Sequence, residues 1–445
     1  MSPNSYVLHS TRTLTAEGLK EAWVVIEGEK ILEVSSSPVT GLPITELGDA
    51  VLMPGLIDSH VHINEPGRTE WEGFETATKA AAAGGITTLV DMPLNSSPVT
   101  TNVEAMRKKL RAAGGKIAVN CGLYGGIVPG NTGDLLPLSG AGVLGIKAFL
   151  SHSGIDDFPN VTEADLRAGM PLIAQAGLPL LVHAELVSEH PEINAMDAAP
   201  RSHDAWLRSR PKSWENDAID LLIRLCREYR CRTHIVHLSS SEAIPALEAA
   251  IKEGLPITVE TCPHYLVFAA EDIEDGQTVF KCAPPIRERA NNELLWEALR
   301  NGLITMVVTD HSPATPDLKG LGDGRFREAW GGIASLQYSL PATWTGAKQR
   351  GFSIEDVASW MSSNVARFLE LDGSKGKIAA GYDADLVVWN PEATCNTAAE
   401  SIHHRHPVSP YAGMNLQGQV LQTYVGGNLV FDHGAFLNLN SGKLL

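Results

Sequence analysis

The sequence predicts an α/β protein: a (β/α)8 TIM barrel with a small β-sandwich domain formed by the N- and C-terminal segments. In the middle of the 445-residue chain, apolar segments typical of buried strands alternate with helical patterns, as in βαβ units. At both ends, short runs alternate apolar and polar residues between turns, which indicates antiparallel strands. We therefore expect residues 1–52 and 376–445 to form the β-sandwich domain together, and residues 53–375 to form the barrel.

Eight apolar segments are candidate barrel strands. The first is the run from Ala50 to Ile57, which continues to His60. The other seven are Ile86–Val90, Ile117–Asn120, Leu144–Phe149, Leu178–His183, Thr233–Leu238, Ile257–Glu260 and Ile304–Asp310. Helical patterns with N-caps and glycine stops lie between them, over Val103–Ala113, Asp165–Ala176, Ser241–Lys252 and Ala290–Arg300.

Composition narrows the classes of partner and compartment. The net charge of −17 argues against nucleic-acid and anionic-membrane partners, which need basic patches. Six cysteines without a Cys-x-x-Cys motif do not make a disulfide framework. The N-terminus has no apolar core of signal-peptide type, and no run approaches the roughly 18 apolar residues that span a bilayer. We expect a reduced, soluble, cytoplasmic protein.

A His-x-His pair, His60 and His62, closes the first candidate strand. Residues two apart in an extended chain point to the same side, so both imidazoles can reach one metal ion. Taken alone, such a pair is more often two ordinary core or surface histidines. Other residues of the chain are needed to distinguish a metal-binding pair from two ordinary histidines.

Further titratable residues stand at the ends of other candidate strands. The active site of such a barrel is built at the C-terminal ends of its strands. The residues expected at this rim are His60, His62, Lys147, His183, His237 and Asp310. Six such residues from five strands are improbable by chance, and together they predict a metal site.

Lys147 is the unusual member of this set because an ammonium repels metal cations. Two neighbouring ions need a bridging anion, and the set contains no bridging glutamate. A buried lysine with a lowered pKa can react with carbon dioxide, and the resulting carbamate would supply two oxygens. The spacing is equally compatible with a lysine paired with a carboxylate.

A two-metal site of this kind is suited to amide hydrolysis. Two divalent ions about 3.5–4 Å apart would hold a hydroxide and polarise a carbonyl. Asp310 would bind one ion and act as general base, then as general acid to the leaving nitrogen. We expect zinc, with cobalt, manganese or nickel as alternatives that the same ligands accept.

Motifs over essentially the whole chain resemble the amidohydrolase superfamily, in its branch of dihydroorotases, dihydropyrimidinases (hydantoinases) and allantoinases. The matching segments are residues 54–62, 145–149, 182–185, 235–239, 308–313 and 381–389. The resemblance implies that His60, His62, carbamylated Lys147 and Asp310 bind one metal ion. Lys147, His183 and His237 would bind the other. It also implies a homotetramer.

Pocket positions differ within this branch. Asn64 and Ala283 stand where dihydroorotases carry the Arg and Asn that bind the substrate carboxylate, so dihydroorotate would lose both partners. His152 stands where hydantoinases place an oxyanion-binding Tyr. Residues 60–68, 91–96, 281–287 and 329–334 instead resemble the allantoinases, which implies hydrolysis of allantoin to allantoate.

Four residues are candidates for contact with the substrate: Asn64, Asn95, Ser312 and Gly332. Asn95 is also a residue that turns favour, and Gly332 is equally compatible with a plain loop. Two other functions are open. A hydantoinase or dihydropyrimidinase would share the metals and differ in the pocket. A non-enzymatic scaffold would have lost the ligands, and here all six positions hold competent residues.

Overall fold

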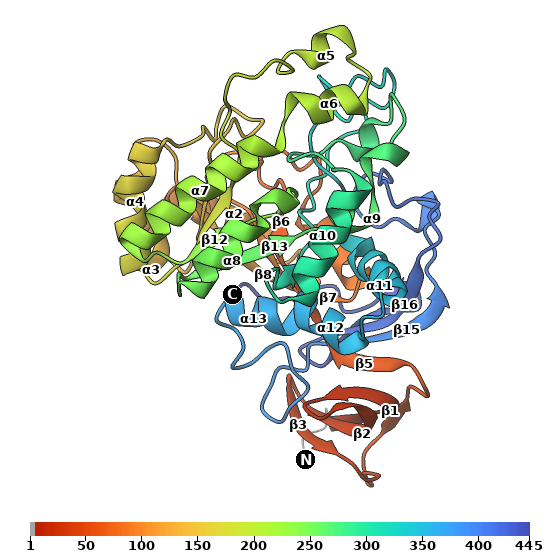
Figure 1. The fold of residues 1–445 in the computed structure, drawn as a ribbon. Coiled ribbons are helices and arrows are strands. Elements are labelled where there is room, and N and C mark those ends of the chain that lie inside the picture. The colour runs from red at the N-terminus through yellow and green to blue at the C-terminus, as the bar shows by residue number, and fades with distance from the viewer. Residues whose placement is uncertain (1–4) are drawn as a thin grey trace.

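The computed structural model describes residues 5–445. A barrel of parallel strands surrounded by helices occupies the centre of the molecule, and strands from both ends of the chain form a separate sheet (Figure 1). The predicted TIM barrel is confirmed. Within the described residues no helix is long and apolar enough to cross a membrane. All six cysteines are free, and five are buried.

Eight parallel strands form the barrel within residues 56–307. They are β6 (Leu56–Val61), β7 (Ile86–Asp91), β8 with its continuation β9 (Asn120–Leu123 and Gly125–Gly126), β10 (Ile146–Phe149), β11 (Leu180–His183), β12 (Thr233–Ile235), β13 (Ile257–Thr261) and β14 (Met306–Val307). Strands that are adjacent in the barrel are also consecutive in the sequence. The bond from His62 N to His311 O, 2.8 Å long, joins the last strand region to the first and closes the ring.

The helices cover the outside of the barrel and its rim. Their bounds are α1 (Phe74–Ala83), α2 (Val103–Ala113), α3 (Leu135–Gly140), α4 (Glu163–Gln175), α5 (Ala195–Ala198), α6 (His203–Ser209), α7 (Lys212–Tyr229), α8 (Ile244–Lys252), α9 (Pro263–Val267), α10 (Arg289–Arg300), α11 (Ser339–Gln349), α12 (Ile354–Ala358) and α13 (Asn364–Phe368). The predicted helix 103–113 matches α2, where Asn102 caps the N-terminus by accepting from Ala105 N at 2.9 Å.

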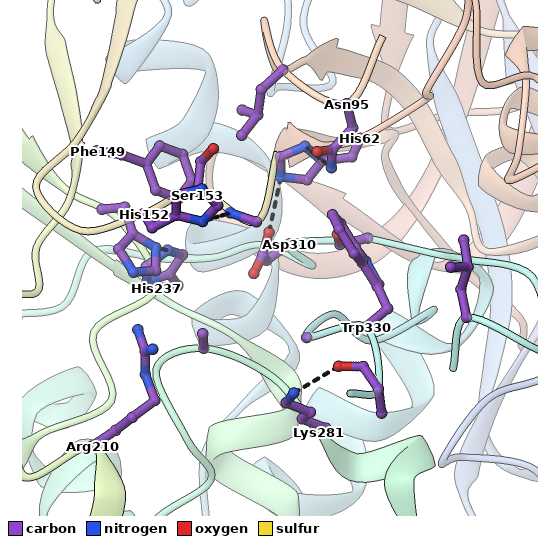
Figure 2. A pocket seen from close by; sticks show the side chains of 18 of the residues that line it. His62, Asn95, Phe149, His152, Ser153, Arg210, His237, Lys281, Asp310 and Trp330 are labelled. Atoms are coloured by element: carbon purple, nitrogen blue, oxygen red, sulfur yellow. Dashed lines mark hydrogen bonds and ion pairs between the residues drawn. The ribbon is translucent and has the colours of Figure 1, made fainter. Parts of the chain in front are cut away.

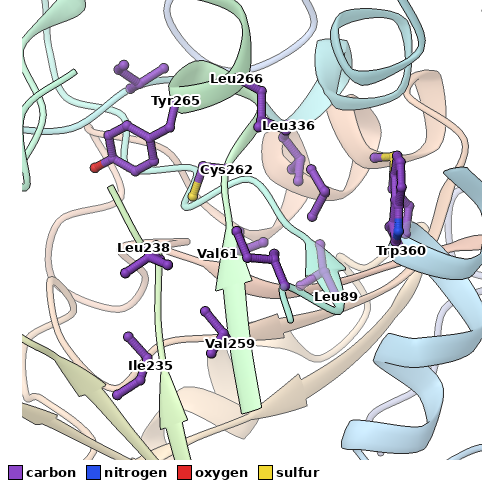
Figure 3. Close-up of a cluster of buried hydrophobic side chains, with 14 of the residues drawn as sticks. Val61, Leu89, Ile235, Leu238, Val259, Cys262, Tyr265, Leu266, Leu336 and Trp360 are labelled. Atoms are coloured by element: carbon purple, nitrogen blue, oxygen red, sulfur yellow. The ribbon is translucent and has the colours of Figure 1, made fainter. Parts of the chain in front are cut away.

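Side chains alternate between the inside and the outside of the barrel. Figure 3 shows part of the outward set: Leu89, Ile235 and Val259 belong to one buried cluster, which extends to Trp360 between α12 and α13. The next residues along the same strands, such as Val90 and Val236, belong to a separate core. This two-residue period also decides which polar side chains reach the mouth of the barrel.

The apolar run at Ala50–Ile57 is divided between two sheets rather than forming one strand. Val51–Pro54 is β5, which pairs with strands from both chain ends, and β6 begins only at Leu56. Gly55 separates them, where an added Cβ would lie 2.2 Å from Thr87 Oγ1. A glycine is needed there because the backbone passes so close to β7.

The third barrel strand also differs from its prediction. It is Asn120–Leu123, whereas the sequence favoured Ile117–Asn120. Residues 117–119 are buried beneath the C-terminal tail instead: Gly442 N donates to Ile117 O at 3.1 Å, and Cys121 N donates to Lys443 O at 2.8 Å. An apolar run shows that a segment is buried, but it does not identify the segment that covers it.

The terminal sheet combines strands from both ends of the chain. It contains β1 (Ser5–Thr15), β2 (Gly18–Glu27), β3 (Lys30–Ser35), β4 (Ile44–Glu46), β5, β15 (Leu386–Thr394), β16 (Gln417–Val425), β17 (Asn428–Asp432) and β18 (Ala435–Phe436). On β15, Leu386 and Val388 share a core with Leu8 of β1, while Val387 and Trp389 pack in the barrel core. The termini therefore pack together and against the barrel.

Candidate metal centre and active site

The six residues that the sequence predicts at the rim all reach the mouth of the barrel. They are His60 on β6, His62 just beyond it, Lys147 on β10, His183 at the end of β11, His237 after β12 and Asp310 after β14. All six are buried. Figure 2 shows His62, His237 and Asp310 facing one cavity from different parts of the chain.

Asp310 stands at the centre of the first group of ligand atoms. Its Oδ1 lies 3.1 Å from His60 Nε2 and 3.3 Å from His62 Nε2. Atoms of His60, His237 and Asp310 also lie within 4.8 Å of one another, close enough to share one ion. These imidazole nitrogens and this carboxylate are ligands that divalent metal ions prefer.

Contacts of the ring nitrogens that face away from Asp310 orient the imidazoles. His60 Nδ1 lies 2.5 Å from Glu260 Oε1, and because a carboxylate only accepts, Nδ1 carries the proton. The Nε2 atom of His60 is thereby left as the ring nitrogen that faces the site, 3.1 Å from Asp310 Oδ1. The Asn95 Nδ2 atom lies 3.2 Å from His62 Nδ1 and donates to it, which fixes the orientation of that ring.

The second group of ligand atoms is held by an acidic and a basic residue outside it. His183 Nδ1 and His237 Nε2 face each other at 3.0 Å. Glu185 Oε2 accepts from His183 Nε2 at 2.7 Å, which leaves Nδ1 as a lone pair. Arg210 in turn donates to both oxygens of Glu185. The chain from Arg210 to His183 fixes the direction of one ligand.

Lys147 points into the site without a hydrogen-bond partner in the described part of the chain. Burial lowers its pKa to about 8, although the carboxylates of Asp310 and Glu260 act in the opposite direction. The lysine–carboxylate pair that the sequence left open is not formed within residues 5–445. A buried amine with a lowered pKa and a free Nζ fits the chemistry of a carbamate, since the neutral amine reacts with carbon dioxide.

Strong electrostatic coupling holds the acidic groups ionised. Burial alone would raise the pKa of Asp310, but His60 and the hydrogen bonds from His60 and His62 hold it well below its usual value. Burial likewise opposes ionisation of Glu260, whose pKa is nevertheless lowered to about 2 by His60 and His234. Both carboxylates are therefore anions among imidazoles, which suits them to a cation site.

Backbone conformation is unusual at the same rim. Eight residues other than glycine have a positive φ within residues 5–445. Four of them are at or beside the site: Asn64, Asn95, His237 and Asp310. Such conformations cost about 1–3 kcal/mol each and persist where the surroundings enforce them, which is common at functional sites.

A cavity of about 400 Å³ opens beside the ligand groups. Of the candidate substrate-contacting residues, Asn95 and Ser312 line it. Asn64 and Gly332 are not among its lining residues. The Asn64 side chain donates to Pro313 O at 3.3 Å, and the Gly332 carbonyl accepts from Lys319.

Several functional residues were missed by sequence reasoning. Glu185 and Glu260 were visible only as acidic residues near strand ends, where they had no assigned role. Arg210, Lys281 and Trp330 line the cavity from loops (Figure 2). Lys281 and Trp330 fall in segments 281–287 and 329–334, which resemble the allantoinases, but the sequence assigns neither residue a role. The signal that could have found Glu185 is its place two residues after His183, on the same side of an extended chain.

Comparison with protein families matches the amidohydrolase family model over residues 51–430. The chain belongs to the amidohydrolase family. An allantoinase of Streptomyces avermitilis is 48% identical over 448 residues, covering 100% of this chain and 99% of the relative. An allantoinase of Arabidopsis thaliana is 45% identical, covering 99% and 90%.

The fold of this amidohydrolase is shared with solved structures. An L-hydantoinase (dihydropyrimidinase) from Arthrobacter aurescens matches with a TM-score of 0.93 and 29% identity over 99% of both chains. Family membership over most of the chain makes this protein a hydrolase. The family match also favours an enzyme over the non-enzymatic scaffold, since all six candidate residues lie at the mouth of the barrel.

Proposed function

We propose that this protein is an allantoinase, which hydrolyses a ring amide bond of allantoin to give allantoate in purine and ureide catabolism. The observation that carries this proposal is the near-full-length identity of 48% and 45% with two allantoinases. The solved L-hydantoinase has nearly the same fold at only 29% identity, so the hydantoinase alternative has less support.

We infer that the six rim residues hold two divalent ions, most simply zinc. His60, His62 and Asp310 would bind one ion, His183 and His237 the other, and a carbamate on Lys147 would join them. The imidazole nitrogens that face the site, the ionised Asp310 and the unpartnered Nζ of Lys147 support this proposal. When bound, the ions would supply Lewis-acid activation of the carbonyl and of water.

The residues of the chain itself would orient the substrate and move the proton. Asp310 is ionised and stands at the cavity, so its carboxylate can take a proton from the attacking water. The same carboxyl then returns the proton to the ring nitrogen as the amide bond breaks. Phe149 and Trp330 line the cavity with apolar surface and limit the access of other water to the reacting atoms.

The remaining assignments rest on the resemblance for the oligomeric state and on composition for the compartment and the partners. We propose a homotetramer in the cytoplasm, with the small molecule allantoin as its substrate and with neither nucleic acid nor membrane as a partner. The net charge of −17 supports the last point, because phosphate-rich surfaces attract basic proteins.

A substrate panel tests the proposed reaction. Metal-reconstituted protein with bicarbonate present is assayed on allantoin, hydantoin, dihydrouracil and dihydroorotate. We expect kcat/KM for allantoin to exceed the others by about 100-fold or more, because a pocket built for polar groups discriminates strongly against analogues that lack them. Chelation should remove the activity. Preference for hydantoin or dihydrouracil would overturn the allantoin assignment in favour of the hydantoinase alternative.

A further inference from the structure

Two buried lysines beside the cavity, Lys281 and Lys319, have no carboxylate at ion-pair distance within residues 5–445. Lys319 Nζ donates to three backbone carbonyls, those of Lys281 (2.8 Å), Trp330 (3.1 Å) and Gly332 (2.5 Å). Lys281 Nζ donates to the carbonyls of Arg327 (3.1 Å) and Ala329 (2.6 Å). The two lysines are linked, since one binds the backbone of the other.

Burying these two ammonium groups costs desolvation free energy, which their hydrogen bonds have to offset. Burial lowers the pKa of each to about 7. Three carbonyl acceptors match the three N–H groups of a charged lysine, so Lys319 is fully satisfied in its protonated form. An apolar side chain of similar length would fill the same space without the desolvation cost. Simple packing therefore does not account for these residues.

The carbonyls that the lysines bind belong mostly to one short segment. Residues 327–332, which we name the Trp330 segment, contain no helix or strand. Four of its six carbonyls accept from Lys281 or Lys319. Ala329 and Gly332 of this segment are buried, and buried backbone groups need partners that a segment outside regular structure has no ladder to supply. The two lysines supply hydrogen-bond donors to these carbonyls instead.

The Trp330 segment forms part of the cavity wall. Trp330 and Gly331 line the cavity, and Lys281 lines it beside them (Figure 2). The Trp330 ring meets Trp71 edge-on at 4.7 Å. An added Cβ at Gly154, in the loop after β10, would lie 3.4 Å from the same ring. The ring thus fills the space between the segment and the loop that follows the strand of Lys147.

We propose that Lys281 and Lys319 are positioning residues, which form a latch that holds the Trp330 segment as a wall of the active-site cavity and so sets which ring substrates fit. This inference deepens the allantoinase proposal and rests on it for the identity of the substrate. The contacts of the latch lie within this chain and do not depend on the identity of the substrate. Its loss should change substrate binding more than the chemical step, because the latch touches none of the six ligand residues.

The test uses Lys281→Met and Lys319→Met, which keep the length of the side chain and remove its donors. The full-length, metal-reconstituted protein is compared with Lys348→Met, which changes an exposed lysine on α11. We expect each latch variant to raise KM for allantoin about 10- to 100-fold, the range for lost hydrogen bonds to charged groups, with kcat changed less than about threefold. Metal content and the Lys348→Met parameters should stay as in the wild type.

Two further measurements separate the latch from the proposed function. Amide hydrogen exchange in residues 327–332 should accelerate at least about tenfold in the latch variants, whatever the substrate is. Preference for allantoin over hydantoin should also fall, and Lys281→Arg should retain part of it. Wild-type KM, preference and exchange rates in Lys281→Met would overturn the latch, even if Lys319→Met failed to fold. Wild-type protein inactive on allantoin would overturn the substrate alone, because the exchange rates would still report on the latch.

Discussion

Replacing Asp310 by asparagine is expected to lower kcat for allantoin by at least about 1,000-fold. The substitution keeps the shape of the side chain and removes its negative charge, so proton acceptance is lost, a contribution of about 10²–10⁴-fold. The Oδ1 atom also lies 3.1 and 3.3 Å from the two histidines of the first ligand group, so metal binding should weaken as well. Steady-state kinetics of the metal-reconstituted variant measures the effect.

The matched control is Asp49→Asn, which changes an exposed aspartate in the terminal region and should behave as the wild type. Circular dichroism and metal analysis of Asp310→Asn show whether the fold and the ions are retained. Near-wild-type turnover by Asp310→Asn would remove this residue from the role of general base.

Lys147→Ala is expected to abolish turnover and to reduce the number of bound ions. The variant loses the proposed anionic bridge, and it leaves a space at a buried position where Lys147 has no other partner within residues 5–445. A short carboxylic acid such as acetate or propionate should enter that space and restore part of the activity. The measurement is kcat/KM for allantoin as a function of added acid, with metal content determined at each point.

The control for this rescue is Asp310→Asn, which should not respond to the same acids. Equal stimulation of both variants would show that the acids act elsewhere. Two bound ions with wild-type turnover in Lys147→Ala would contradict the bridge.

The rim residues could be predicted because two simple rules locate them. Side chains alternate along a strand, and the C-terminal ends of parallel barrel strands meet. Lys147 and Phe149 on β10, and Leu181 and His183 on β11, accordingly share the inward side. A strand prediction that is right to within two residues is enough to place such side chains at one mouth.

The supporting residues could not be predicted because their partners are distant in the sequence. Glu260 supports His60 from 200 positions away, and Arg210 reaches Glu185 from 25 positions away, across a segment that contains α5 and α6. The latch shows the same limit, since Lys281 and Ala329 meet only when two loops fold over the barrel. Local patterns determine strands and helices, whereas loop packing depends on the whole fold.

The most direct test of the central claim is a titration of metal-free protein with zinc, in the presence and absence of bicarbonate, with allantoate formation and bound metal measured at each point. We predict that turnover rises with bound zinc, levels off at about two ions per chain, and needs bicarbonate when the protein has been freed of carbon dioxide. Full turnover in the metal-free protein, or a plateau at or below one ion per chain without bicarbonate, would contradict a two-metal site joined through Lys147.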